Sequence, residues 1–313
     1  MKAAQFNNYG GPDVIEVDHN APIPSLGEGQ ILIECYAASI NPIDSILRAG
    51  YMQKMVLLNF PATIAGDFSG KVRELGSGVT DFGIGDEVFG FAPIIAGGSG
   101  AAAEFIAANA LMTANKPSMA SFSEAAALPL AGVSAIQAIQ NEIKPVPSQK
   151  VLIHGGAGGI GSFAIQYAKH LGCYVATTVR ASQKDFARNL GADKIVDFEA
   201  EQFEKVLKDY DAVLDTVGGD VYKRSFQILK KGGIVVSMVQ NPPDQESMSK
   251  FGARSVYAST QVNRASLSRI SELVDKDAIR VYVGREFPLE KTREAYAYFE
   301  NDHPKGKVVI RVK

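Results

Sequence analysis

The feature that most constrains this chain is a short apolar run that breaks into glycines and then resumes as a helical pattern. The run is Val151-Leu-Ile-His154, followed by Gly155-Gly-Ala-Gly-Gly-Ile-Gly161. Gly156, Gly158 and Gly161 match G-x-G-x-x-G, which in a strand-to-helix turn allows a tight bend and a close approach of backbone N–H groups to a pyrophosphate. The motif is short, and the alternative is a turn with only a structural role. The residues around the motif therefore decide between a dinucleotide site and a structural turn.

The residues after the glycines predict a helix and then a second strand. Apolar side chains fall on one helical face, at Ile160, Ala164, Tyr167, Ala168 and Leu171. Residues 174–179 read as the next strand. A phosphate loop of the Walker type is excluded, because Ser162 follows the last glycine where that motif needs Lys-Ser or Lys-Thr. The strand–turn–helix–strand context therefore predicts a dinucleotide site.

The end of the second strand indicates which dinucleotide binds. An NAD-preferring site usually carries an acid there, about 20 residues after the glycines, for the ribose hydroxyls. This segment has no acid and offers Arg180, Ser182 and Lys184 instead. A guanidinium fork, a hydroxyl and an ammonium suit a 2′-phosphate, so we expect NADP(H) rather than NAD(H). The alternative is an exposed, solvated basic turn.

The chain changes character near residue 121. Before it, short strands alternate with frequent glycine and proline, which predicts a partly closed β-barrel, interrupted by a helix that starts at Asn41-Pro42. After it, strands and helices alternate, which predicts a parallel, doubly wound sheet. The expected strands are 194–196, 212–215, 234–238 and 255–259, and the expected helices are 183–190, with Ser182 as N-cap, and 203–210. From residue 263 we expect a helix over 267–275, an extended piece near 279–283, a helix over 292–299 and a closing strand over 307–312.

Composition limits the class of protein. A chain of 313 residues favours two domains, and a net charge of −2 with 21% charged residues argues against a nucleic-acid surface or an anionic-membrane surface. No run approaches the roughly 18 apolar residues of a membrane span, and the first residues lack a signal-peptide core, so a soluble protein is expected. Cys35 and Cys173 lack a C-x-x-C partner, which suits a reducing cytoplasm; each is most simply a small buried apolar residue.

Several stretches together resemble the zinc-independent medium-chain dehydrogenases/reductases, in the quinone oxidoreductase (zeta-crystallin-like) group. They are residues 37–44 (AASINPID), 64–70 (IAGDFSG), 85–88 (GDEV), 126–131 (AALPLA), 154–161 (HGGAGGIG), 190–193 (LGAD), 214–219 (LDTVGG) and 306–310 (GKVVI). The resemblance implies an α/β chain with a GroES-like β-barrel catalytic domain, residues 1–121 and 263–313, and a doubly wound Rossmann domain for NADP(H), residues 122–262. It also implies homodimers joined through the last Rossmann strand, near residues 255–259.

The sequence departs from the zinc-containing members of that family. Asn41 stands near their first ligand position, Gly66-Asp67-Phe68 replaces Gly-His-Glu, and no cysteine lies near Leu130. Two scattered cysteines cannot supply a closed structural zinc site, which needs about four ligands. The histidines, at 19, 154, 170 and 303, show no metal-like spacing, and each is interpreted as a surface or core residue. We therefore predict no metal.

The resemblance assigns further cofactor contacts. Gly158, Gly159, Ile160 and Gly161 would meet the pyrophosphate, and Phe198 would lie against the adenine. Nicotinamide-side positions would be Val217, Gly218, Met238, Val239 and Gln240, with Gln261, Val262 and Asn263 near the cofactor amide. For Phe198 and Val217, ordinary packing is the alternative.

Metal-free hydride chemistry needs groups that orient the substrate and stabilise or protonate an oxyanion. Asn41 is a candidate donor to a carbonyl oxygen. Tyr51 stands where related enoyl reductases carry a tyrosine implicated in proton supply. Asp44 either orients its neighbours or only starts a helix, and a structural part is favoured for Asp67. The expected function is NADPH-dependent reduction of quinones or α,β-unsaturated carbonyls (enones), with a substrate pocket built from residues 51–60 and 93–100. The alternative is a non-catalytic NADPH-binding redox sensor, structural protein or RNA binder, although the near-neutral charge speaks against RNA.

Overall fold

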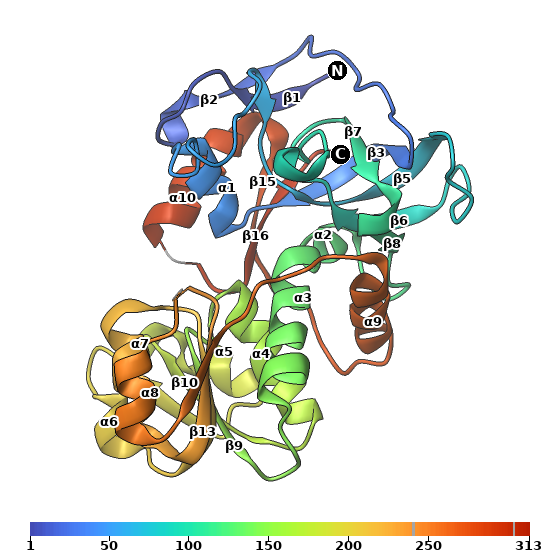
Figure 1. Cartoon of the computed structure of the whole chain (residues 1–313). Helices are drawn as coiled ribbons and strands as arrows, with labels where there is room; N and C mark the ends of the chain where they lie inside the picture. Colours follow the sequence, from blue (N-terminus) through green and yellow to red (C-terminus); the bar gives the residue numbers. More distant parts are fainter. Residues whose placement is uncertain (240–241, 303) are drawn as a thin grey trace. The chain divides into compact units, whose positions relative to one another are not determined.

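The computed structural model describes residues 1–239, 242–302 and 304–313, and the chain divides into two compact units (Figure 1). Unit 1 comprises Met1–Ala131, Val262–Asp277 and Val281–Lys313, and unit 2 comprises Gly132–Gln261 and Ala278–Arg280. Both ends of the chain therefore build unit 1, and unit 2 is formed almost entirely from one continuous segment. These units are defined by compactness alone, so the functional boundaries expected from the sequence stay a prediction.

Unit 1 is built mainly on antiparallel strands, as the short strands and frequent turns predict, and β15 and β16 pair in parallel. Strand β3 (Gln30–Ser39) is central and pairs with β5 (Asp67–Leu75), β7 (Phe105–Asn109) and β16 (Lys307–Arg311). The larger sheet has the order β15-β16-β3-β5-β6-β8, with β7 on β3, and the smaller one has the order β2-β1-β4. The remaining strands are β1 (Ala3–Phe6), β2 (Ile15–Asp18), β4 (Ala62–Thr63), β6 (Glu87–Phe91), β8 (Thr113–Asn115) and β15 (Val283–Pro288).

The helices of unit 1 are α1 (Pro42–Arg48), α2 (Phe122–Ala126), α9 (Arg264–Asp275) and α10 (Thr292–Asp302). Helix α1 confirms the start predicted at Asn41, its N-cap residue. The extended piece expected near 279–283 was misplaced, because the strand begins at Val283. Most of β15 is exposed at the edge of the sheet, where hydrophobic alternation gives no signal.

Unit 2 carries a six-stranded, fully parallel sheet of order β11-β10-β9-β12-β13-β14. The chain adds strands to one side of β9 and then crosses to β12, so the order reverses between β9 and β12. The carboxyl ends at such a reversal form the usual ligand crevice of this architecture. The strands are β9 (Lys150–His154), β10 (Tyr174–Val179), β11 (Lys194–Asp197), β12 (Tyr210–Asp215), β13 (Leu229–Ser237) and β14 (Arg254–Tyr257).

Helices cover this sheet, whose central strands are apolar on both faces. Leu152 and Val213 on one face, and Ile153 and Leu214 on the other, are fully buried, as expected of parallel strands. The helices are α4 (Gly159–His170), α5 (Lys184–Asn189), α6 (Phe203–Val206), α7 (Gly219–Ser225) and α8 (Gln245–Phe251). Helix α3 (Pro129–Gln137) joins the two units and continues into a π-helical turn, Ala138–Ile143.

The predicted N-cap of α5 was wrong. Ser182 lies inside a 3₁₀ turn, Ala181–Gln183, and Gln183 precedes the helix. The Gln183 side chain accepts the backbone N–H of Arg180 at 3.2 Å, so it closes this turn in place of a serine cap. Arg180 is thereby held at the end of β10.

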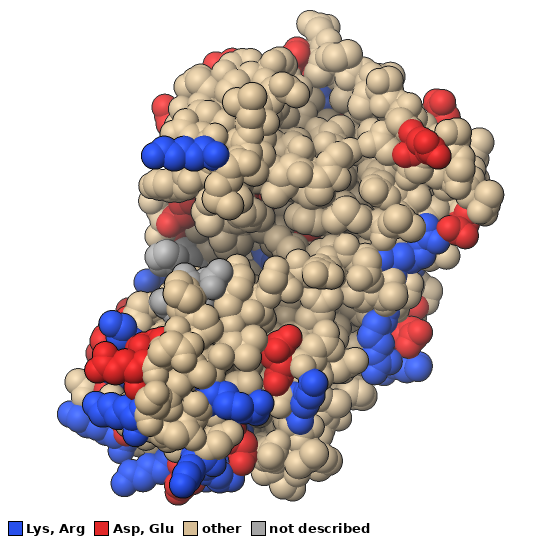
Figure 2. Space-filling model, in the orientation of Figure 1, with Lys and Arg blue, Asp and Glu red and all other residues tan. Residues whose placement is uncertain are grey.

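In Figure 2, Lys and Arg side chains lie among Asp and Glu side chains over the part of unit 2 that carries α6, α7 and α8. No continuous basic surface is visible on the face shown.

Across residues 1–239, 242–302 and 304–313, no helix has the length and apolar character that crossing a membrane requires.

Candidate functional site

The glycine turn lies between β9 and α4, at the carboxyl edge of the parallel sheet. Gly155 has a φ of 68°, a left-handed conformation that glycine adopts without strain. The turn closes when Gly158 N–H donates to the Gly155 carbonyl oxygen at 3.0 Å, and α4 begins at Gly159. No side chain caps α4, so its first N–H groups face outward at the positive end of the helix. The prediction that the glycines open a helix is confirmed.

The three motif glycines have different structural reasons. A Cβ on Gly156 would lie 1.9 Å from Thr177 Oγ1, and one on Gly161 would lie 2.3 Å from the Gly155 carbonyl oxygen. A Cβ on Gly158 would meet nothing closer than 3.4 Å. Packing alone therefore requires glycine at 156 and 161, whereas the space beside Gly158 is open. This open space, next to uncapped N–H groups, fits a cofactor pyrophosphate.

His154, the last residue of β9, directly precedes the turn, and its buried ring leaves no space for a ligand. Its ring is fully buried, with Nδ1 at 3.0 Å from Thr178 Oγ1 and Nε2 at 3.0 Å from Ser225 Oγ. Burial lowers the pKa of His154 to about 4, so the ring is neutral at pH 7. The interpretation of this histidine as a core residue is confirmed.

The loop after β12 is held by a buried carboxylate. Asp215 accepts the N–H groups of Val217 at 3.0 Å and Gly218 at 2.9 Å, and the Ser237 hydroxyl at 2.7 Å. Val217 is 51% exposed at this edge, and Val239, after β13, is 54% exposed. Ordinary core packing therefore does not explain Val217. Met238 is half-buried, and Gln240 lies outside the described residues.

The predicted 2′-phosphate residues lie at the end of β10 and are already paired with acids. Arg180 Nε is 3.3 Å from Glu199 Oε1, and Lys184 Nζ is 3.0 Å from Asp197 Oδ2. Both acids belong to the end of β11 and the turn that follows it. The sequence analysis missed them, although a parallel β11 beside β10 brings these ends together. Exposed neighbours are Ser182 and the aromatic Phe198, which is 51% exposed and so is not a core residue.

A side-chain amide fixes the loop before α9. Gln137 Nε2 donates to the Gln261 carbonyl oxygen at 2.8 Å, and its Oε1 accepts the Gln261 N–H at 3.0 Å. Asn263 caps α9, with its side chain accepting from Ser266 N–H at 2.9 Å, and Val262 between them is buried. The assignment of residues 261–263 to the cofactor amide stays a prediction.

Asn41 is the centre of a buried polar cluster in unit 1. Its Nδ2 donates to Asp67 Oδ2 at 2.8 Å, and its Oδ1 accepts from Lys307 Nζ at 2.6 Å. These two partners fix the orientation of the amide, because only an oxygen can face the ammonium. Asp44 accepts the backbone N–H of Asn41 at 2.8 Å. Lys307 was not predicted from the sequence; the only signal was a lysine directly before three apolar residues, 308–310, in the closing strand.

Charge balance in this cluster depends on protons. Asp67 is fully buried and also accepts Leu130 N–H at 3.0 Å, and Lys307 Nζ lies 3.7 Å from its Oδ2. Burial raises the pKa of Asp67 and lowers the pKa of Lys307. Burial raises the pKa of Asp44 to about 7, assisted by the charge of Asp67. Two carboxyl groups thus share one ammonium, and a proton on Asp44 neutralises the set.

Stability should therefore fall as pH rises through neutrality. Asp44 binds its proton more tightly in the folded state, so its stabilising contribution is complete below about pH 4 and is lost as pH rises through about 7. The full change is up to about 4 kcal/mol, since each pKa unit is worth about 1.4 kcal/mol. Asp44→Asn keeps an acceptor for Asn41 N–H and removes the titration. Urea unfolding from pH 5 to 8 should show a flatter profile for this variant; an unchanged slope would contradict the assignment to Asp44.

Tyr51 is not part of this cluster. It follows α1 and is 82% exposed, whereas Asn41 and Asp44 are 2% and 7% exposed. Within the described part of the chain no hydrogen bond involves its hydroxyl group. The structure therefore brings Asn41 and Asp44 together, joins them to Asp67 and Lys307, and leaves Tyr51 in solvent.

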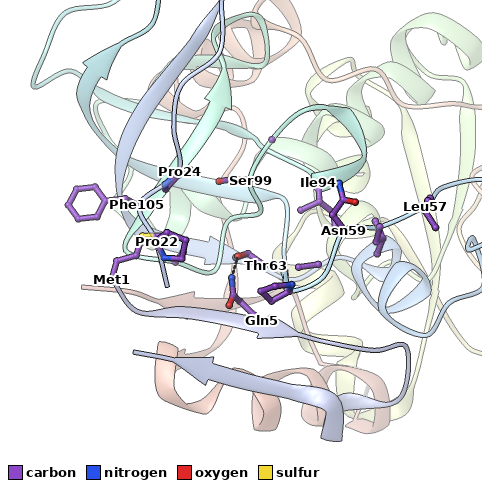
Figure 3. Close-up of a pocket in the computed structure, with 15 residues that line it drawn as sticks. Met1, Gln5, Pro22, Pro24, Leu57, Asn59, Thr63, Ile94, Ser99 and Phe105 are labelled. Carbon is purple, nitrogen blue, oxygen red and sulfur yellow. Dashed lines mark hydrogen bonds between the residues drawn. The ribbon is translucent and has the colours of Figure 1, made fainter. Parts of the chain in front are cut away.

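Unit 1 also contains a cavity of about 330 Å³ (Figure 3). Leu57 and Asn59 line it together with Ile94 and Ser99, so both loops expected to form the substrate pocket reach it. On another side Gln5 Nε2 donates to Thr63 Oγ1 at 3.2 Å, drawn as a dashed line in Figure 3. Asn41, Asp44 and Tyr51 do not line this cavity.

In the described ranges no three His, Cys, Asp or Glu side chains are grouped so that they could hold a metal ion. The absence of a metal remains a prediction.

Two protein families match the chain. The alcohol dehydrogenase GroES-like domain family matches residues 27–136, and the family described as zinc-binding dehydrogenase matches residues 190–310. An Arabidopsis thaliana protein named NADPH-dependent alkenal/one oxidoreductase, chloroplastic, is 32% identical over 99% of this chain and 79% of its own length. This chain belongs to the medium-chain dehydrogenase/reductase family.

Solved structures of the same family place the chain in its quinone oxidoreductase group. The quinone oxidoreductase of Coxiella burnetii has a TM-score of 0.92 and 36% identity, covering 100% of this chain and 99% of that one. The Escherichia coli quinone oxidoreductase complexed with NADPH has a TM-score of 0.89 and 25% identity, with 100% of both chains covered. The GroES-like and Rossmann folds expected from the sequence are confirmed.

Proposed function

We propose that this protein is an NADPH-dependent oxidoreductase that reduces quinones or α,β-unsaturated carbonyl compounds by hydride transfer. The observation that carries the proposal is the open space beside Gly158 at the uncapped start of α4. It lies at the same edge of the parallel sheet as Arg180, which follows β10. The Arabidopsis relative is named for NADPH and alkenal/one substrates, and the C. burnetii and E. coli structures are named quinone oxidoreductases.

Residues of unit 2 would hold the cofactor. The N–H groups from Gly158 to Gly161 suit the pyrophosphate, and Arg180, Ser182 and Lys184 suit the 2′-phosphate. Phe198 offers an exposed ring for the adenine, and the exposed valines at 217 and 239 offer an apolar surface for the nicotinamide. When bound, the nicotinamide supplies a hydride.

Residues of unit 1 would handle the carbonyl and the proton. Reduction adds a hydride and a proton, so the chain must donate a proton or admit one from water. An amide NH₂ has two N–H donors, and Asn41 uses one of them on Asp67, so the second remains for a carbonyl oxygen. Tyr51 can release a proton from its hydroxyl and recover one directly from solvent, because it is 82% exposed. The proton would go to the enolate of an enone or to a quinone oxygen.

Tyr51→Phe should lower enone turnover by about 100-fold, the low end for loss of a general acid, and leave NADPH affinity unchanged. Removing one exposed hydroxyl costs no packing, so folding should be unaffected. Steady-state rates with an enal and cofactor titrations by fluorescence measure the two effects. Unchanged turnover would remove Tyr51 as the proton donor and leave water in that role.

The proposal is tested by following NADPH oxidation with a panel of quinones, enals and enones. Turnover with at least one class is expected, and saturation should occur at lower concentrations with NADPH than with NADH. Tight NADPH binding without turnover on any member would instead favour a non-catalytic NADPH-binding protein, and a gel shift with RNA would then separate a sensor from an RNA binder.

We also propose that the protein is a homodimer joined through β14. This strand is the edge of the parallel sheet, where unpaired backbone groups favour pairing with a second copy, and Tyr257 is 38% exposed there. Light scattering should give twice the mass of one chain; a single-chain mass at micromolar concentration would contradict the dimer.

We further propose that it works in the cytoplasm. Cys35 and Cys173 are buried, free thiols, which suits a reducing compartment. Some relatives carry chloroplastic or mitochondrial names, so fractionation of cells expressing the tagged full chain decides between these locations.

A further inference from the structure

The two cations at the end of β10 differ in how firmly they are held. Strands β10 and β11 are parallel, with Val179 opposite Asp197, so the residues that follow each strand meet at one edge. Lys184 pairs with Asp197 and Arg180 pairs with Glu199. The surroundings of the two carboxylates decide what each cation can do when a ligand arrives.

Asp197 has a structural role in the turn after β11. Its side chain is only 6% exposed, and its carboxylate accepts the N–H of Glu199 at 3.2 Å as well as the ammonium of Lys184 at 3.0 Å. The hydrogen bond from Lys184 lowers the pKa of Asp197, so this acid stays ionised at neutral pH. Lys184 is therefore committed to a carboxylate that shapes the turn, and only its remaining donors can reach a ligand.

Glu199 is an exchangeable partner. Its side chain is 58% exposed, and its Oε1 lies 3.3 Å from Arg180 Nε. Elsewhere in the described structure no acceptor takes the terminal N–H groups of this guanidinium, whose side chain is 38% exposed. Exposed ion pairs are weak, so a better anion can replace the carboxylate. A phosphate is such an anion, because two of its oxygens can match the guanidinium fork.

We propose that Glu199 is a specificity-determining residue that sets the preference for NADPH over NADH by competing for Arg180. A 2′-phosphate must displace the carboxylate and then remain near its negative charge, so Glu199 weakens NADPH binding. The 2′-hydroxyl of NADH carries no charge and neither displaces Glu199 nor is repelled by it. This inference rests on the proposed function, in which Arg180 binds the 2′-phosphate.

The test compares dissociation constants of the full chain for NADPH and NADH, measured by cofactor fluorescence. Glu199→Gln should tighten NADPH binding about three- to tenfold, since an exposed ion pair is worth up to about fivefold and the repulsion adds to it. NADH binding should change less than twofold. Glu201→Gln is the matched control: it removes the same charge two residues away on an exposed side chain, and NADPH binding should change less than twofold.

A double variant separates competition from general repulsion. In an Arg180→Ala background, Glu199→Gln should gain less than it does in the wild-type background, because only the repulsion is relieved and no cation is released. The inference is overturned if Glu199→Gln leaves NADPH affinity within twofold of the wild type, if Glu201→Gln gains as much, or if the gain is as large in the Arg180→Ala background. Failure of the proposed cofactor site looks different: the wild type would bind NADH as tightly as NADPH, and Arg180→Ala would leave NADPH affinity unchanged.

Discussion

Gly158→Ala is expected to fold normally and to lose most of its affinity for NADPH. The new methyl group meets no atom closer than 3.4 Å and the backbone at 158 is extended, so the free energy of unfolding should change by less than about 1 kcal/mol. The same methyl group would stand where the pyrophosphate approaches the N–H groups of α4. Loss of one charge-assisted hydrogen bond is worth about 1.5–3 kcal/mol, so NADPH should bind about 10- to 100-fold more weakly. Calorimetric titration with NADPH measures this change.

Gly161→Ala provides the matched control, three residues along the same motif. Its methyl group would lie 2.3 Å from the Gly155 carbonyl oxygen and 2.7 Å from the Gly156 Cα, and neither backbone atom can move freely. Overpacking of this kind costs about 1–3 kcal/mol or more, so urea unfolding should show clear destabilisation. If both variants lose stability equally, or if Gly158→Ala binds NADPH like the wild type, the open space beside Gly158 is not the phosphate site.

Lys307→Met should be among the most destabilising substitutions in unit 1. The Lys307 ammonium is 4% exposed and donates to the Ile40 carbonyl oxygen at 2.8 Å and to Asn41 Oδ1 at 2.6 Å. Its removal leaves Asp67 without a cation inside the protein, and breaking a buried ion pair in this way costs about 3–5 kcal/mol. Unfolding in urea at pH 7 measures the loss.

The deficit of Lys307→Met should shrink as the pH falls. Without the ammonium, burial of Asp67 and Asp44 in the folded protein is favourable only when both carboxyl groups are protonated. Low pH supplies those protons. The double variant Lys307→Met with Asp67→Asn should recover part of the stability, because position 67 then carries no charge while its amide oxygen can still accept a hydrogen bond. A deficit that is the same at pH 5 and pH 8 would show that Lys307 acts through its hydrogen bonds to Ile40 and Asn41 rather than through its charge.

Local pattern was sufficient to predict the strand, glycine turn, helix and second strand from residue 150 to residue 179. The glycine spacing, the apolar helix face from Ile160 to Leu171 and the strand at 174–179 depend on short-range backbone geometry, which a sequence records directly. The predicted start of α5 was less accurate, because more than one neighbouring polar side chain could close the turn before it. Ser182 was predicted to do so, and Gln183 does. The edge strand β15 was misplaced because its exposed residues carry no hydrophobic alternation.

By itself the sequence determined the two fold classes, the glycine turn and the basic segment at 180–184, because each is encoded by residues close together in the chain. Only the tertiary structure decided which charged residues contact Asn41 and Arg180. Lys307 meets Asn41 because β16 pairs with β3, and Glu199 meets Arg180 because β11 lies beside β10. Strand pairing sets such contacts, and it depends on burial of whole sheet faces rather than on the charged residues at the strand ends.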